Sequence, residues 1–262
     1  MKAQVNGITM NYELSGPEGA SPVVLHHPLA TNLTIWDELT ATLGPRYQVL
    51  RMDARGHGQT EAPLGPYMFE TLAGDIVALM DHVKFGRAHF LGLSMGGMVG
   101  QYLGLLHASR FRSLALVSTT SCIPDDAKSV WDERETATRA GGMASQLANA
   151  MERWVSVEGR KRPELVARLS GMIEKTPVEG YLGWCGAIRD LNISGRLKAI
   201  TLPTRIIVGE QDPATPVAAS QIIHDEITGS DLIIMPAVSH MLCAEDPEAF
   251  HGHVLLFLAA HD

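Results

Sequence analysis

The sequence predicts an α/β protein with a mostly parallel central sheet, helices on both sides of it and an inserted helical cap. Two observations predict the sheet: the chain contains short apolar, β-branched runs bounded by Gly, Pro or Asp, and these runs alternate with helix-length segments. The runs cover residues 22–28, 47–53, 88–94, 113–119, 204–212 and 231–240. A third observation predicts the cap, because residues 121–196 contain no such run.

The remaining elements follow in chain order. Residues 3–14 alternate in polarity around Asn6-Gly7, which predicts an antiparallel hairpin at the start of the sheet. Residues 143–155 and 164–175 show helical periodicity and belong to the cap. We therefore expect a core built from residues 1–120 and 197–262, interrupted by a cap over residues 121–196.

Charge and composition exclude several classes of function. The chain of 262 residues has 21 Lys plus Arg against 29 Asp plus Glu, a formal charge of -8, which argues against partners such as nucleic acid or an anionic membrane. An anionic small substrate would need a local arginine. The three cysteines, Cys122, Cys185 and Cys243, lack zinc-site spacing, and an odd number of cysteines cannot all pair within one chain. The first residues lack the charged-then-apolar pattern of a signal peptide, and no apolar run is long enough to span a membrane, so we expect a cytoplasmic protein.

The strongest chemical motif is Gly92-Leu93-Ser94-Met95-Gly96, which follows an apolar run and precedes a helical pattern. A strand-to-helix turn this tight presents the serine hydroxyl at a helix N-terminus, and the small glycines let the neighbouring backbone approach. Backbone amides at that end stabilise developing negative charge. The motif predicts that Ser94 is a nucleophile.

A nucleophilic serine needs a base, and the base needs an orienting acid. In this arrangement the acid and then the histidine follow the serine in the chain, at the ends of later strands. Asp212 and His240 stand at those two places. Glu210 is a rival acid, although Asp212 is favoured because it lies just past the strand in an Asp-Pro turn.

Two other motifs favour structural roles. Residues 55–60, Arg-Gly-His-Gly-Gln-Thr, form either an anion-binding turn or a loop held by side-chain hydrogen bonds, and we favour the loop. His26-His27 looks like a metal pair, but no further ligands stand at metal spacing, so no metal is expected.

Together these residues make the chain resemble the α/β-hydrolase superfamily and, within it, the 3-oxoadipate enol-lactonases. The similar segments are residues 50–63, 65–81, 92–97, 131–134, 139–143, 176–192, 208–216 and His240. The resemblance implies a cofactor-free serine hydrolase of a small lactone or ester in aromatic-compound degradation, with Ser94, Asp212 and His240 as its triad. It also implies a monomer or weak homo-oligomer.

The resemblance further implies residues that bind the substrate. The backbone N–H of Met95, next to the nucleophile, would form one half of the oxyanion hole. The substrate of this family carries a carboxylate, and a guanidinium binds a carboxylate with two hydrogen bonds. Arg134 is the expected partner and Arg139 the second choice, with Trp131 beside them in the cap.

The chain departs from the family pattern after its first parallel strand. Pro28 stands where the second oxyanion donor is expected, and proline has no N–H. We expect the N–H of Leu29 to replace it, or the imidazole of His27. Alternative functions are hydrolysis of another ring-derived ester, amide or C–C bond, cofactor-free oxygenation, or non-catalytic binding of a small molecule.

Overall fold

The computed structural model describes residues 1–262, and its eight strands form one sheet in the order β1-β2-β4-β3-β5-β6-β7-β8. The strands are β1 (Lys2–Val5), β2 (Ile8–Ser15), β3 (Ser21–His26), β4 (Tyr47–Met52), β5 (Ala88–Leu93), β6 (Phe111–Val117), β7 (Thr204–Gly209) and β8 (Asp231–Met235). From β4 to β8 every neighbouring pair is parallel. The predicted mostly parallel sheet is confirmed.

The predicted hairpin at the start of the chain is also confirmed. β1 and β2 pair antiparallel, and β2 pairs antiparallel with β4. The connecting Asn6 and Gly7 both have positive φ, 46° and 80°, as the tight turn between two such strands requires.

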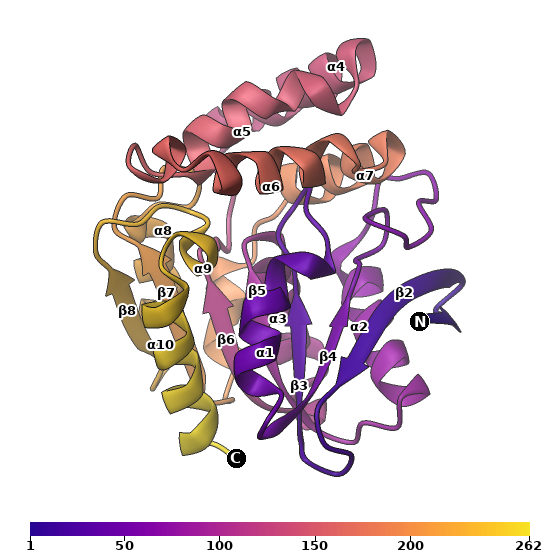
Figure 1. The fold of residues 1–262 in the computed structure, drawn as a ribbon, viewed down its shortest axis with the longest axis vertical. Helices are drawn as coiled ribbons and strands as arrows, with labels where there is room; N and C mark the ends of the chain where they lie inside the picture. Colours follow the sequence, from indigo (N-terminus) through magenta and orange to yellow (C-terminus); the bar gives the residue numbers. More distant parts are fainter.

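Helices cover both faces of the sheet, as Figure 1 shows. Their bounds are α1 (Asp37–Leu43), α2 (Phe69–His82), α3 (Met95–Leu106), α8 (Val217–Glu226), α9 (Leu242–Glu245) and α10 (Pro247–Ala260), with 3-10 turns η1 (Leu33–Trp36), η2 (Ala108–Arg110) and η6 (Ser194–Ala199). α1 packs against α10 on one face, and α2 packs against α3 on the other. The central strand β5 is consequently buried along its whole length.

A second layer of helices lies over the carboxyl ends of the parallel strands (Figure 1). It comprises η3 (Asp125–Ala127), α4 (Lys128–Gly141), η4 (Met143–Gln146), α5 (Leu147–Trp154), η5 (Gly159–Lys161), α6 (Pro163–Glu174) and α7 (Val178–Arg189). The figure shows α4 and α5 farthest from the sheet. This layer contains no strand, in agreement with the sequence pattern.

The chain enters and leaves the helical layer through a short neck, residues 121–123 and 191–193. Cys122 and Asn192 form an isolated antiparallel bridge, and Ile123 N–H donates to the carbonyl of Leu191 over 2.9 Å. The neck supports our proposal that residues 121–196 are a cap on a core of residues 1–120 and 197–262.

The layer is firmly joined to the sheet by apolar packing. One cluster of 72 buried apolar residues includes sheet residues such as Val24 and Leu91 together with Trp154, Leu169 and Trp184 of the upper helices. Burial of apolar area is the main favourable contribution to folding, so these helices and the sheet stabilise one another. No helix of the structure is both long and apolar enough to span a bilayer.

Candidate active site

Ser94 occupies the sharp turn between β5 and α3. Its backbone lies at φ 55° and ψ -113°, a conformation that L-residues rarely adopt. A Cβ atom on Gly92 would lie 2.2 Å from the carbonyl oxygen of Gly96, so the flanking positions leave no room for a side chain. The predicted serine elbow is therefore present, with the glycines acting through close backbone approach.

Hydrogen bonds to β6 and the segment after it fix the strained turn. The Ser94 N–H donates to the carbonyl of Val117 over 2.8 Å, and the hydroxyl of Thr119 donates to the Ser94 carbonyl over 2.8 Å. These contacts over-determine the backbone at Ser94, which is how a strained residue persists in a folded protein.

Asp212 and His240 come from the loops after β7 and β8 and meet beside the carboxyl end of the sheet. His240 Nδ1 lies 2.8 Å from Asp212 Oδ2. With its Nδ1–H donated to a carboxylate, the imidazole keeps the lone pair of Nε2 free to accept a proton. The rival acid Glu210 is exposed, and its carboxylate accepts the N–H of Ala237 over 3.1 Å instead.

Thr215, which the sequence pattern did not single out, completes the surroundings of Asp212. Its N–H donates to Oδ1 over 3.0 Å and its hydroxyl to Oδ2 over 2.9 Å, and the N–H of Ala214 donates to Oδ1 over 2.8 Å. Burial raises the pKa of the Asp212 carboxyl, but the charge of His240 and the hydrogen bonds outweigh burial and lower the pKa overall. Asp212 is thus kept as a carboxylate that orients His240.

Ser94, His240 and Thr215 line one cavity beneath the cap helices. Its volume is about 60 Å³, which corresponds to the space of a few water-sized spheres. The cap contributes aromatic and apolar walls, among them Trp131, Trp154 and Tyr181. Because Ser94 and His240 are both buried, the cap keeps bulk water away from them.

The loop after β3 brings the predicted residue Leu29 to this cavity. Leu29 and the following Ala30 line it. The N–H of Ala30 is used, since it donates to His57 Nε2 over 2.9 Å, whereas the N–H of Leu29 donates no hydrogen bond within the chain. The N–H of Met95, in the first turn of α3, is likewise unpaired. Leu29 and Met95 therefore have the free donors that an oxyanion hole requires.

His27 does not line the cavity, so the expectation that its imidazole contacts the substrate is wrong. Nε2 accepts the N–H of Ala54 over 2.9 Å, and Nδ1–H donates to the carbonyl of Pro28 over 2.8 Å. Both ring nitrogens are committed to loop backbone. Burial lowers the pKa of His27 to about 4, so the ring is neutral at pH 7.

The Arg-Gly-His-Gly loop after β4 has the structural role that we favoured. Arg55 forms a salt bridge with Asp75 at 2.7 Å, and His57 accepts the N–H of Ala30. The motif thus holds the loop that carries Leu29 against the core. The guanidinium of Arg55 is paired with Asp75 and is not available to a ligand.

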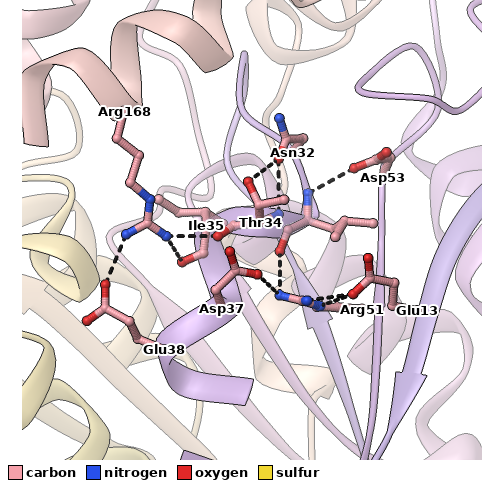
Figure 2. A network of polar contacts seen from close by, with 10 residues as sticks. Glu13, Asn32, Thr34, Ile35, Asp37, Glu38, Arg51, Asp53 and Arg168 are labelled. Atoms are coloured by element: carbon pink, nitrogen blue, oxygen red, sulfur yellow. Dashed lines mark hydrogen bonds and ion pairs between the residues drawn. The ribbon is translucent and has the colours of Figure 1, made fainter. Parts of the chain in front are cut away.

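A polar network around η1, shown in Figure 2, fixes the other end of that loop. Asp53 Oδ1 accepts the N–H of Leu33 over 2.8 Å. Arg168 on the cap helix α6 donates to the carbonyl of Thr34 over 2.8 Å and pairs with Glu38 at 3.0 Å. The figure shows this arginine reaching down from α6, so the same network ties the cap to the loop.

Two of the predicted substrate-binding residues, Trp131 and Arg134, line the cavity from α4. The guanidinium of Arg134 lies 4.3 Å above the centre of the Trp131 ring, a cation–π contact, and pairs with no carboxylate. Burial lowers the pKa of Arg134, although the group stays charged at any physiological pH. It is available to an anionic ligand.

Arg139 does not reach the cavity, so the second choice is wrong. Its side chain is exposed, lies 4.0 Å from Glu135 and borders a separate surface hollow beside Arg189. Arg134 and Arg139 are five residues apart, which places them about 140° apart around an α-helix.

Sequence reasoning also missed Arg153, which lines the cavity from α5 next to Asn149 and Ala150. A signal was present. Ala150 and Trp154 are four residues apart and mark the inward face of α5, and Asn149 and Arg153 have the same spacing on the adjoining face.

Comparisons with known proteins show the family of the chain. The family model described as the alpha/beta hydrolase fold matches residues 21–247. The chain is 32% identical to 3-oxoadipate enol-lactonase 2 of Acinetobacter baylyi, with 94% of this chain and 92% of that protein aligned.

Solved structures give the same result. The enol-lactonase from Burkholderia xenovorans LB400 is 34% identical, superposes with a TM-score of 0.95, and the match covers 99% of this chain and 100% of that one. A hydrolase from Pseudomonas aeruginosa PA01 is 33% identical with a TM-score of 0.94, covering 98% and 97% of the two chains. The fold predicted from the sequence is confirmed, and the chain belongs to the α/β-hydrolase family.

Proposed function

We propose that the protein is a serine hydrolase that opens a small, carboxylate-bearing lactone of the 3-oxoadipate enol-lactone type. The observation that carries the proposal is the buried cavity in which the strained Ser94 and the Asp212-oriented His240 meet. The similarity to enol-lactonases over almost the whole chain supports the choice of substrate.

In the first step, Ser94 attacks the lactone carbonyl while His240 Nε2 accepts the hydroxyl proton. Asp212 holds the imidazole in the tautomer that can accept this proton and stabilises the imidazolium that results. The carbonyl oxygen becomes an oxyanion, which the free N–H groups of Leu29 and Met95 stabilise.

In the second step, the tetrahedral intermediate collapses and the ring C–O bond breaks. His240 returns the proton to the departing enol oxygen, which remains tethered in the acyl-enzyme because the substrate is cyclic. Water, deprotonated by His240, then attacks the acyl carbon and releases a carboxylic acid and free Ser94, while the enol tautomerises to a ketone. Both half-reactions use the same oxyanion donors.

Arg134 supplies the charge that this substrate needs. Its guanidinium lines the cavity and has no carboxylate partner within the chain. A carboxylate bound there is held by charge-assisted hydrogen bonds and places the lactone carbonyl toward Ser94.

A hydrolysis panel tests the proposal. Wild-type protein is assayed with 3-oxoadipate enol-lactone, with other carboxylate-bearing esters and with neutral esters of similar size, beside Ser94→Ala. We expect the carboxylated lactone to be preferred and the variant to lose on the order of 10³-fold or more in kcat. A fluorophosphonate adduct at Ser94, detected by mass spectrometry, gives a second readout.

Three outcomes contradict the proposal. Turnover retained by Ser94→Ala would indicate chemistry without a serine nucleophile. Ready hydrolysis of neutral esters with no preference for the lactone would exclude a carboxylate-bearing lactone as the specific substrate. Absence of the covalent adduct in folded protein would exclude an activated serine.

A further inference from the structure

The cavity continues outward into an apolar groove between α4, the neck and α8. The groove has a volume of about 500 Å³ and shares Thr120, Ile123, Trp131, Arg134 and Thr215 among its walls with the cavity. Its outer part is lined by apolar side chains that include Val130 and Ile222, which are 42% and 47% exposed. The shared walls place the groove directly beside the cavity that contains Ser94, so the groove is a candidate route from the surface.

The charges along this route are all of one sign. Arg134 and Arg153 line both the cavity and the groove, and no Asp or Glu lines either of them. A different opening, between α4 and α5, is bordered by the same two arginines but also by Glu133. In a chain of net charge -8, a passage with two guanidiniums and no carboxylate is a local reversal of sign.

Arg153 is a partly buried arginine whose guanidinium, like that of Arg134, has no carboxylate partner within the chain. It forms no salt bridge and no side-chain hydrogen bond, whereas Arg51, Arg55, Arg168 and Arg205 all pair with carboxylates. A guanidinium has five N–H donors in a planar fork that matches a carboxylate. Two unpaired cations on the same walls also repel each other, and an anion between them relieves this repulsion.

We propose that Arg153 is a specificity-determining residue that binds the substrate carboxylate together with Arg134, and that the substrate reaches Ser94 through the apolar groove. This inference rests on the proposed hydrolase function and deepens it, because it assigns a second guanidinium to the substrate carboxylate and names the path of the substrate to Ser94. Arg134 stacks on Trp131 and is held in place, whereas Arg153 approaches from α5, so the carboxylate is bound from two helices.

Kinetics with a matched pair of substrates test the role of Arg153. The pair is a 4-nitrophenyl ester with a terminal carboxylate, 4-nitrophenyl hydrogen glutarate, and the neutral 4-nitrophenyl butyrate. For Arg153→Ala we expect KM for the anionic ester to rise about 10- to 100-fold with kcat nearly unchanged, because a charge-assisted contact present in both ground and transition states is lost. KM for the neutral ester should stay within about twofold.

Two further variants separate charge from packing. Arg153→Lys should recover part of the affinity for the anionic ester, since it keeps the charge but not the fork. Arg139→Ala, in the separate hollow beside Arg189, is the matched control and should change neither KM. Equal effects of Arg153→Ala on both esters would overturn the assignment of Arg153.

A binding measurement keeps this test independent of catalysis. Glutarate is titrated into wild-type and Arg153→Ala protein by calorimetry, and we expect affinity to fall about 10-fold or more in the variant. If the wild type binds glutarate more tightly than Arg153→Ala but hydrolyses neither the esters nor the enol-lactone, the proposed function fails while the assignment of Arg153 stands. Equal glutarate affinity in the two proteins overturns the assignment.

A matched pair of bulky substitutions tests the route. Ala218 is exposed and lines only the groove, and Ala137 is exposed and lines only the opening beside Glu133. We expect Ala218→Trp to lower kcat/KM for the anionic ester about 10-fold through obstruction, and Ala137→Trp to leave it within about twofold. The reverse order of effects would assign the route to the other opening.

Discussion

Acid should destabilise this protein through a cluster of buried histidines at the loop after β3. His26 and His27 are fully buried, and His57 contacts His27 with the ring centres 5.2 Å apart. Burial and the neighbouring ring lower the pKa of His26 to about 3, and burial lowers that of His27 to about 4. Burial also lowers the pKa of His57 well below its ordinary value.

The direction of the effect follows from proton uptake on unfolding. Below about pH 6.5 the unfolded chain binds a proton at each of these histidines, whereas the folded chain stays neutral there until the pH approaches 4. The contribution of these neutral histidines to the free energy of unfolding is therefore fully present above about pH 6.5 and is lost as the pH falls below that value. At pH 5 the loss is about 2 kcal/mol for each of His26 and His27, a total of about 4 kcal/mol, from shifts of that size. That is a large part of the stability of an ordinary domain.

Urea unfolding at pH 7.5 and at pH 5, followed by far-ultraviolet circular dichroism, measures the loss. His27→Gln keeps an acceptor for Ala54 but does not titrate, so its loss between the two pH values should be smaller by about 2 kcal/mol. His224→Gln, in α8 and outside the cluster, should behave as the wild type. A wild-type stability that is equal at the two pH values, or an unchanged loss in His27→Gln, would refute the reasoning.

Three other substitutions probe the site and its support. Asp212→Asn should lower kcat on the order of 10⁴-fold with the circular dichroism spectrum unchanged, because the amide no longer favours the required imidazole tautomer, and Glu210→Gln should keep its activity. Gly96→Ala should lower the free energy of unfolding in urea by about 2 kcal/mol or more, since the new Cβ would lie 2.4 Å from the His26 carbonyl oxygen. Gly171→Ala is the control: its Cβ meets nothing within 4 Å, so it should stabilise α6 by about 1 kcal/mol. Arg168→Ala should cost about 1–2 kcal/mol through its lost hydrogen bonds to η1, and a cost below about 0.5 kcal/mol would show that the cap needs no such tie.

The fold and the geometry around Ser94 could be predicted because their signals are local or follow chain order. The spacing of Gly92, Ser94 and Gly96 encodes the turn directly. The contact between Asp212 and His240 could be predicted because parallel strands align their carboxyl ends, so loops far apart in the chain meet at one edge.

The substrate-binding side chains could be predicted only in part, because they depend on how helices pack. Arg139 would have been excluded by the helical period alone, given that Arg134 faces inward. His27 could not have been excluded in that way, since its ring is taken by the N–H of Ala54, which lies in the loop after another strand. The spacing of Ala150, Arg153 and Trp154 indicates one side of α5, but only the packing of the cap helices shows that this side lines the cavity.

The neck at Cys122 and Asn192 has a consequence for how such a chain can change over time. Because the segment's two ends are hydrogen-bonded neighbours, residues between them can be lengthened, shortened or exchanged without displacing any strand. Under the proposed function, substrate selectivity can therefore be inherited as a module, independent of Ser94, Asp212 and His240 below it. The exchange has one condition: an incoming segment must supply apolar side chains where Trp154 and Trp184 now sit, or the sheet's upper edge is left exposed to solvent.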